Sequence, residues 1–445
     1  MKGFIGFILR LSVLIALAVW LADRPGTARI IWHDYVIETS AAFLGLCGFA
    51  LGFIFYLLFR FWHLIKFGPL QWRLHRKLRK MKQGQDQLTA GMVAIASGNA
   101  SEAGRMAISA RKALGPTAAT QLLQAQAAQL AGDHKAARAL FQQLAANSES
   151  AILGFRGLIM EARRDQDWGE VAHLVSKLRD LKPNTPWLNV IRFELLTRQQ
   201  AWHEAGLALT QATAAQLMDG TTTKQARAAI LTAQSQNEAR FGSKDKSLQL
   251  AEQAVKQAPD WLPGIINLAQ KQMLTEHHRA AHRTIEKNWQ LHPHPHLAAA
   301  YRTDGSNPMD AYKHIMKLCR DHETLPESRL ALAEAALAAD IWGEARRHLI
   351  ALISHGHATQ KTYRLMARLE RRESGDEQAA LQWMTKAADA AADPVWLCQS
   401  CGGGHEDWQP ICKYCSGFNT LAWQSPGVSR APAPKTSLLG DNWID

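Results

Sequence analysis

The chain is poor in aromatic residues, in cysteine and, over one long stretch, in acidic residues. Aromatic residues make up 8% of its 445 residues, and there are six cysteines. So few cysteines exclude a fold that is held together by disulfides. A composition that is 47% hydrophobic and 20% charged excludes wholesale disorder and collagen. Alanine is very frequent, and small residues at that density favour closely packed helices over sheets.

The sequence also lacks the glycine-rich and nucleophile motifs of several large enzyme classes. It contains no GxGxxG after a strand pattern, no P-loop and no GxSxG. Gly402, Gly403 and Gly404 are interpreted as a turn and not as a phosphate-binding loop. Because no catalytic constellation is visible, we expect a protein that is not an enzyme.

Acidic residues are absent between Glu38 and Asp86, where basic residues accumulate instead. Eight of them lie within 23 residues: Arg60, Lys66, Arg73, Arg76, Lys77, Arg79, Lys80 and Lys82. They account for eight of the twelve net positive charges of the chain. Since the excess charge is local, it is poor evidence for nucleic-acid binding by the body of the protein, and no nucleic-acid partner is expected.

Two apolar segments lie before these eight basic residues. Ala41–Phe59 has no charge and approaches the length of about 20 residues that a helix needs to cross a bilayer. Met1–Ala22 carries only Lys2 and Arg10, and it is interpreted as a retained anchor, with a signal peptide as the alternative. The positive-inside rule then places the basic flank and everything after it in the cytoplasm, with a short loop between the spans outside. The sequence therefore predicts a multi-pass anchor in a lipid bilayer.

A GxxxG pair lies within the second apolar segment. Gly48 and Gly52 would allow two helix backbones to approach closely, so a helix contact at this pair is one hypothesis. The basic residues that follow are interpreted first as a topology determinant, and binding to anionic lipid headgroups is the alternative.

Residues 87–394 repeat with a period of 34. Two series show the spacing: Ala103, Ala137, Val171 and Ala205 are small, and Ala107, Phe141, Val175 and Leu209 follow them four residues later. This period and pattern are those of tetratricopeptide repeats, which predict an α-solenoid of about eight helix pairs with a concave face. Trp168, Trp202 and Trp342 are interpreted as packing residues at the interfaces between helices.

The period fades between His292 and Pro326, which predicts an atypical repeat or a junction. Histidines cluster before and within this stretch: His277, His278, His282, His292, His294 and His296. A metal or porphyrin site is one interpretation of the cluster. We favour an extended linker with exposed imidazole rings.

Two CxxC pairs near the end of the chain predict a metal centre. Cys398 and Cys401 form one pair, Cys412 and Cys415 form the other, and ten residues separate them. Four thiolates in this spacing suit structural Zn²⁺, with iron in a rubredoxin-like centre as the alternative. Four protein ligands leave no open coordination position, which favours a structural role. Aromatic residues surround the pairs: Trp396, Trp408, Tyr414, Phe418 and Trp423.

The predicted fold class is all-α, with two N-terminal transmembrane helices, a tetratricopeptide-type α-solenoid and a small C-terminal four-cysteine zinc ribbon that alone should contain strands. Five segments are expected: a two-span membrane anchor (1–60), a basic juxtamembrane segment (61–86), the solenoid (87–394), a zinc-ribbon or rubredoxin-like module (395–424) and a flexible tail (425–445). Because each repeat contacts only its neighbours, the module should unfold on loss of its metal while the repeats stay folded. Leu438–Asp445 is interpreted as a docking peptide.

Several short motifs resemble the HemY family of bacterial inner-membrane proteins associated with haem biosynthesis. They are the run from Ala125 to Asp133, the run from Gly154 to Leu158 with Glu161 to Arg164 and Asp167 after it, and Pro183 with Trp187. The two apolar segments and the basic flank fit the same family. The resemblance covers residues 1–215 closely and the later repeats loosely.

The resemblance implies a membrane-tethered tetratricopeptide protein that serves the late haem pathway without established catalytic residues. Its expected place is the bacterial inner membrane, with the solenoid and the C-terminus in the cytoplasm. Its expected partners are proteins, namely haem-pathway enzymes bound by the solenoid. The CxxC pairs resemble the rubredoxin-like tail of lipopolysaccharide assembly protein B. An adaptor that regulates envelope biogenesis through a membrane protease is therefore the alternative function.

Overall fold

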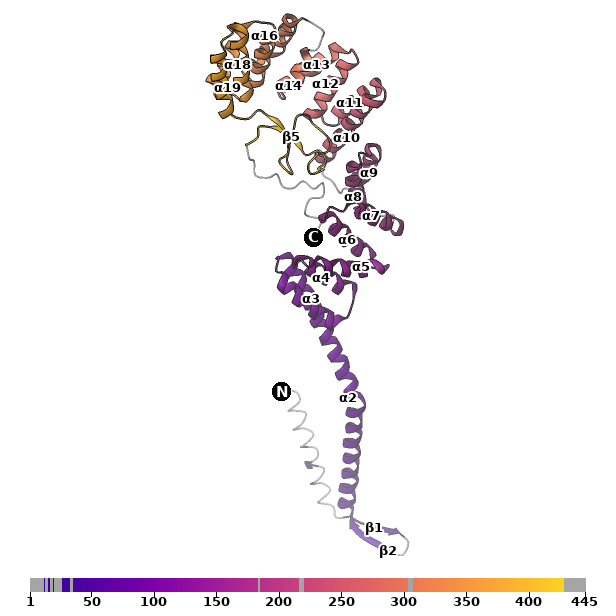
Figure 1. The fold of residues 1–445 in the computed structure, drawn as a ribbon. Helices are drawn as coiled ribbons and strands as arrows, with labels where there is room; N and C mark the ends of the chain where they lie inside the picture. The colour runs from indigo at the N-terminus through magenta and orange to yellow at the C-terminus, as the bar shows by residue number, and fades with distance from the viewer. Residues whose placement is uncertain are drawn as a thin grey trace. The chain divides into compact units, whose positions relative to one another are not determined.

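The computed structural model describes residues 12, 15, 16, 19, 26–32, 35–182, 185–215, 220–302 and 307–427. The chain divides into two compact units, Met1–Gly154 and Phe155–Asp445. Helices dominate both units, as the abundance of alanine and the 34-residue period predict (Figure 1).

The first unit begins with a β-hairpin. β1 (Thr27–Trp32) pairs antiparallel with β2 (Tyr35–Ser40), and the register sets Thr27 opposite Ser40 and Trp32 opposite Tyr35. The expectation that strands occur only in the C-terminal module is therefore wrong. The two strands are rich in isoleucine, valine, threonine and aromatic residues, which suit a pleated ribbon better than a helix.

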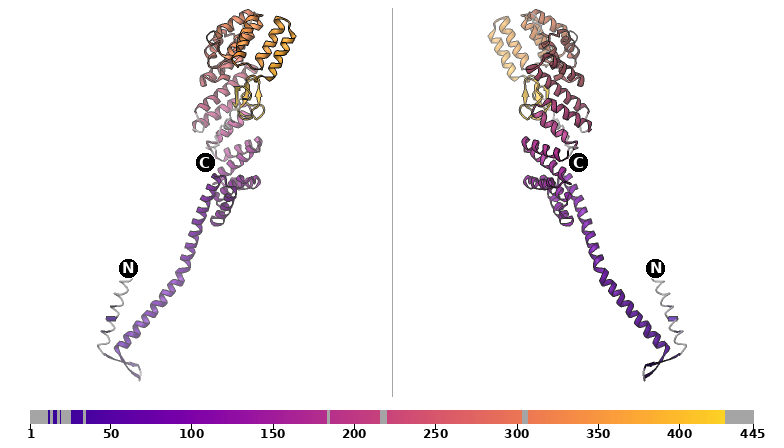
Figure 2. Two further views of the ribbon diagram at one scale, coloured as in Figure 1. Left: turned by 90° about the vertical axis from the view of Figure 1, so that its left-hand side faces the viewer. Right: turned by 90° about the vertical axis from the view of Figure 1, so that its right-hand side faces the viewer.

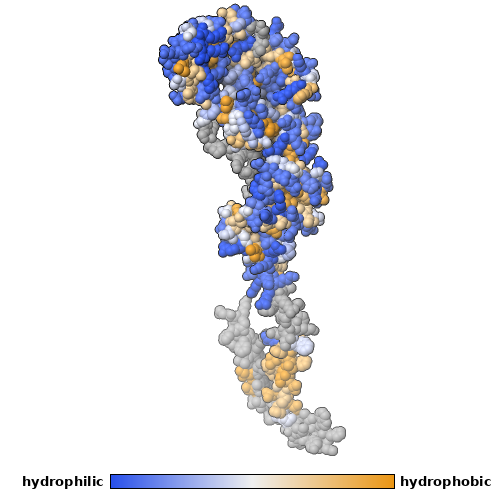
Figure 3. Space-filling model, viewed as in Figure 1, coloured by the Kyte–Doolittle hydropathy of each residue, from blue (hydrophilic) through white to orange (hydrophobic). Residues whose placement is uncertain are grey.

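A single helix, α2 (Ala41–Ala96), follows the hairpin and is 56 residues long. Its segment Phe43–Trp62 is long and apolar enough to cross a membrane, and the described parts of the chain bury none of it. Apolar side chains gather on this part of α2 in Figure 3, whereas hydrophilic residues cover most of the repeats. Figure 2 shows that the helix continues without a break into the repeats.

The other predicted span, Met1–Ala22, lies outside the described residues except for Ser12, Ile15, Ala16 and Val19. One candidate span is thus present among the described residues, and the two-span anchor remains a prediction. Within α2, a Cβ atom built on Gly48 or Gly52 would meet none of the described residues within 4 Å. Among the described residues nothing covers the face that carries the GxxxG pair, and a helix contact through it also remains a prediction.

The repeats of the first unit comprise the end of α2 with α3 (Ala100–Leu114), and α4 (Ala118–Leu130) with α5 (His134–Ala146). The turn inside each pair has the same construction. Gly98 and Gly132, 34 residues apart, have φ angles of 73° and 79°, which glycine adopts without steric cost. The next residues, Asn99 and Asp133, accept hydrogen bonds from backbone N–H groups of α3 and α5 and so cap both helices.

The second unit contains α6 from Phe155 onward and all later elements. The bounds are α6 (Ala151–Arg164), α7 (Trp168–Leu181), α8 (Leu188–Arg198), α9 (Trp202–Ala214), α10 (Gly220–Phe241), α11 (Lys244–Gln257), α12 (Leu262–Leu274), α13 (His278–Trp289), α14 (Pro295–Arg302), α15 (Pro308–Cys319), a 3₁₀ turn η1 (Arg320–His322), α16 (Pro326–Ala338), α17 (Trp342–Ser354), α18 (Gln360–Glu373) and α19 (Glu377–Asp389). They continue the pairing from α6 with α7 to α18 with α19. The described residues therefore hold nine helix pairs, and the stretch where the period fades forms the pair α14 with α15.

The 34-residue pattern is confirmed by burial. The small series Ala103, Ala137, Val171 and Ala205 has no exposed surface, and Phe141 and Leu209 of the second series are at most 2% exposed. The turn conformation also recurs where glycine is absent: Gln166 and Gln200 have φ angles of 58° and 57° at the positions equivalent to Gly98 and Gly132. Packing of the helix pairs thus imposes the left-handed turn even on residues that rarely adopt it.

The predicted packing tryptophans contact side chains of other helices. Trp202 is 6% exposed and belongs to the core that includes Phe193. The guanidinium of Arg198 lies 3.7 Å from the ring centroid of Trp168, and that of Arg372 lies 5.6 Å from the ring centroid of Trp342.

Candidate metal centre

The C-terminal module is a small antiparallel sheet with two cysteine turns. β3 (Val395–Cys398) lies between β4 (Gly404–His405) and β5 (Leu421–Gln424). Trp396 on β3 pairs with His405 on β4 and with Trp423 on β5. Cys398 is the last residue of β3, so the sheet fixes the start of the first cysteine turn.

The two cysteine turns have the same backbone hydrogen bonds. In the first turn, Gly402 N–H donates to Cys398 O at 2.8 Å and Cys398 N–H donates to Gly403 O at 2.9 Å. In the second turn, Ser416 N–H donates to Cys412 O at 2.8 Å and Cys412 N–H donates to Gly417 O at 2.9 Å. Gly402 and Ser416 also share a positive φ. The equal spacing of the two CxxC pairs therefore yields two equivalent turns that face each other.

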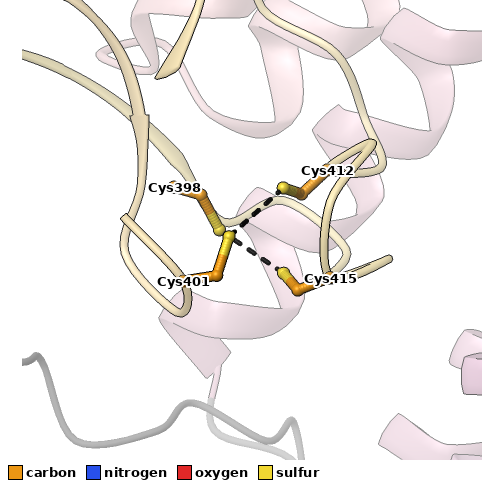
Figure 4. A group of neighbouring side chains, drawn as sticks. All are labelled: Cys398, Cys401, Cys412 and Cys415. Carbon is orange, nitrogen blue, oxygen red and sulfur yellow. Dashed lines mark hydrogen bonds between the residues drawn. The ribbon is translucent and has the colours of Figure 1, made fainter. Parts of the chain in front are cut away.

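The turns bring the four predicted cysteines together. All four sulfur atoms lie within 4.8 Å of one another (Figure 4). The Sγ atoms of Cys398 and Cys415 are 3.6 Å apart, and those of Cys401 and Cys412 are 3.7 Å apart. A tetrahedral ion with Zn–S bonds of about 2.3 Å requires sulfur atoms about 3.8 Å apart. The cluster is therefore able to hold a metal ion.

Electrostatics in the cluster favour a cation. Burial raises the pKa of Cys398, but hydrogen bonds from the Thr420 hydroxyl and from backbone N–H groups outweigh it and bring the pKa to about 6. Burial and the neighbouring thiols raise the pKa of Cys415 to about 12. Several thiolates at such short separations repel one another unless a cation lies between them.

Two further side chains contact the cluster and are not evident from the CxxC spacing. His405 Nε2 lies 3.4 Å from Cys412 Sγ, and Thr420 Oγ1 lies 3.2 Å from Cys398 Sγ. His405 is 4% exposed. Groups that hydrogen-bond metal-binding thiolates orient them and adjust their basicity. Only the sheet register brings His405 and Thr420 to the cysteines, so no local sequence signal identifies them.

The remaining cysteines lie elsewhere. Cys319 is buried in α15, where burial raises its pKa to about 11. Cys47 is an exposed residue of α2.

The module packs against helices far away in the sequence. The ring of Phe418 meets Phe193 of α8 edge to face, with 5.4 Å between centroids, and Trp202 of α9 at 6.4 Å. Trp408 meets Trp261, directly before α12, edge to face at 5.1 Å. The expectation that contacts reach only neighbouring repeats is therefore wrong for this unit. The surplus of aromatic residues around the CxxC pairs is explained by this packing.

One predicted linker histidine is part of the same contact. His294 is fully buried, and its ring centroid lies 4.3 Å from that of Trp423 and 5.6 Å from that of Trp396. Burial, with a smaller effect from His296, lowers the pKa of His294 to about 3. The expectation that the rings of this linker are exposed is thus wrong for His294, because the C-terminal module covers it.

Replacing Phe418 with alanine should weaken this packing without disturbing the cysteines. A fully buried phenylalanine costs about 3–5 kcal/mol when truncated to alanine, and because Phe418 is only partly buried we expect about 1–3 kcal/mol. Limited proteolysis should release the module faster, whereas the metal content should not change. The control is Phe241→Ala, because Phe241 is 88% exposed. Equal cleavage of both variants would show that Phe418 does not fasten the module.

Comparison with known proteins supports the resemblance that the sequence motifs indicate. Residues 26–132 match the family model described as HemY protein N-terminus. A probable magnetosome protein, Mms48 of Magnetospirillum gryphiswaldense, is 29% identical over 194 residues. That alignment covers 42% of this chain and 42% of the relative, so the chain spans about two fifths of the relative's length.

The solved structures that match parts of this chain have low sequence identity to it. A tetratricopeptide repeat protein from Parabacteroides merdae is 12% identical with a TM-score of 0.29, and the match covers 56% of this chain and 93% of that chain. Naa15/Naa10 bound to HypK is 13% identical with a TM-score of 0.41, and covers 71% of this chain and 51% of that chain. A crystal structure of MamA is 15% identical with a TM-score of 0.23, and covers 35% and 92%. Over residues 26–132, this chain is therefore similar to the N-terminal region of the HemY family.

Proposed function

We propose that the protein is a non-enzymatic, membrane-anchored scaffold that organises late haem-biosynthesis enzymes at the bacterial inner membrane. The observation that carries the proposal is α2, a single helix whose first part is apolar enough to span a bilayer and whose last part is the first helix of the repeats. One continuous helix joins the anchor to the repeats, so partners bound by the repeats are kept at the membrane. The assignment to haem biosynthesis rests on the HemY match over residues 26–132.

The repeats supply the surface for protein partners in this proposal. Stacked helix pairs bury their apolar faces against one another and leave long polar surfaces that bind other proteins. Tethering such a surface raises the effective concentration of partners that are themselves at the membrane.

Topology and metal content complete the proposal. The basic residues after Phe59 place the repeats and the C-terminus in the cytoplasm under the positive-inside rule, with Met1–Ala22 as a second span. Cys398, Cys401, Cys412 and Cys415 hold one structural Zn²⁺, and iron is the alternative ion. Reduced cytoplasmic thiols favour a metal over disulfides.

Crosslinking in intact cells followed by purification of the full chain tests the scaffold. We expect late haem-biosynthesis enzymes among the crosslinked proteins, because the repeats would hold them. A bait that contains only residues 1–96 serves as the control, since it keeps α2 but lacks the later helix pairs. Enrichment of envelope-biogenesis proteins and a membrane protease, with haem enzymes at the level of the control, would contradict the proposal and favour the alternative adaptor.

A further inference from the structure

A cavity of about 660 Å³ lies between the C-terminal module and the helices of the second unit. The module contributes Trp396 and the segment from Asp407 to Ile411, and α10 and α12 contribute most of the opposite wall. The volume falls within the range of about 300–1,000 Å³ that is typical of small-molecule sites. Neither the metal centre nor the scaffold role uses this cavity.

Two cations line the cavity without a carboxylate partner. Arg240 lies at the end of α10, and Lys271 lies on α12. In the part of the chain that the structure describes, neither forms an ion pair with an acidic residue. The cavity's one acidic residue, Asp407, is 3.6 Å from His296 and has a side chain that is 75% exposed.

The charge of Lys271 is poorly compensated as a result. Burial lowers the pKa of Lys271, and the positive charge of Arg240 lowers it further. Two like charges beside a partly buried cavity create a positive potential that an anion would neutralise.

We propose that this cavity binds a small organic anion, a carboxylate or phosphate on a flat apolar body. Arg240 and Lys271 bind the anionic group. The rings of Trp202, Trp396 and Trp408 with Ile266 form the apolar wall. Since Trp396 and Trp408 belong to the metal-binding module, the site is complete only while that module is packed against the helices.

Titration calorimetry on the full chain in detergent tests the proposal with hydroxynaphthoate as the probe. Heats are corrected by titration into the same detergent without protein. We expect one saturable site per chain, and binding of the neutral analogue naphthol at least about tenfold weaker because it cannot pair with the two cations. Equal binding of hydroxynaphthoate and naphthol, or no heat beyond the detergent blank, would overturn the proposal.

Substitutions locate the probe. Lys271→Met should weaken hydroxynaphthoate binding about tenfold and leave naphthol binding unchanged. Arg240→Gln is a second variant that tests the cationic pair. Because Arg240 is exposed, this change should not disturb folding. Lys256→Met is the matched control, because it removes the same charge from a separate hollow that α9, α10 and α11 line. A control variant that weakens binding as much as Lys271→Met would show a general charge effect and refute a site at the cavity.

Discussion

Replacement of Cys412 by serine is expected to remove the metal and detach the C-terminal module. Cys412 is 1% exposed and its sulfur lies 3.7 Å from that of Cys401, so the change breaks the centre of the cluster. Structural Zn²⁺ in small finger domains contributes an apparent free energy of about 10–16 kcal/mol. A three-stranded module of this size has little core of its own and cannot replace that contribution. The metal content, measured by elemental analysis, should fall from about one ion per chain to nearly none.

The loss should also reach the helices, contrary to the expectation from repeat sequences alone. Detachment of the module uncovers Phe193, Trp202 and Trp261, which Phe418 and Trp408 cover in the folded protein. We therefore expect a lower thermal midpoint for the helical signal as well, measured by circular dichroism on the full chain. Cys47→Ser is the matched control, because Cys47 lies on α2 outside the module. Unchanged metal content in Cys412→Ser would show that the four cysteines are not the ligand set.

Gly154→Ala should strongly destabilise the first unit. A Cβ atom at this position would lie 2.6 Å from the carbonyl oxygen of Phe141 and 2.7 Å from Cα of Ala145, and it would be closer still to the backbone nitrogen of Ala145. These are backbone atoms of α5, so no side chain can turn away. Overpacking of a core usually costs about 1–3 kcal/mol, and we expect the upper end or more because two helices must separate. Chemical denaturation of the full chain followed by circular dichroism measures the change.

The matched control for this substitution is Gly104→Ala in α3. A Cβ atom on Gly104 would meet nothing within 4 Å. Alanine is favoured over glycine inside a helix by up to about 1 kcal/mol, so this variant should be slightly more stable than the natural chain. If the two variants shift stability equally, the close approach of α5 and α6 at Gly154 is not a determinant of the fold.

The 34-residue period by itself determined the helix pairs. Small residues such as Ala137 must lie where two helices touch, and a capping side chain such as Asp133 must start the second helix of a pair. Both requirements are local, so the sequence of a single repeat is enough to predict its helix pair. The same holds for the CxxC pairs: each pair forms a turn from its own residues, and the equivalence of the turns brings the four thiols together.

Elements that depend on distant partners could not be predicted from the sequence. The segment from Thr27 to Ser40 was expected to be a loop, because a two-stranded ribbon has no second sheet face to impose a clear alternation. The pair α14 with α15 lacks the repeat signature, and its helices form because neighbouring pairs pack against them. The sequence predicts an exposed ring for His294, because nothing near it along the chain indicates that Trp423 covers it.

For this protein, the sequence alone determined the helix pairs, one candidate membrane span and the clustered cysteines. Each depends on residues that are close along the chain or repeat at a fixed spacing. Only the tertiary structure decided that the C-terminal module packs against α8, α9 and the start of α12, with His405 and Thr420 beside its cysteines. It also decided that a cationic cavity lies between the module and the helices. The physical reason is that contacts between aromatic rings more than one hundred residues apart leave no periodic or local trace in the sequence.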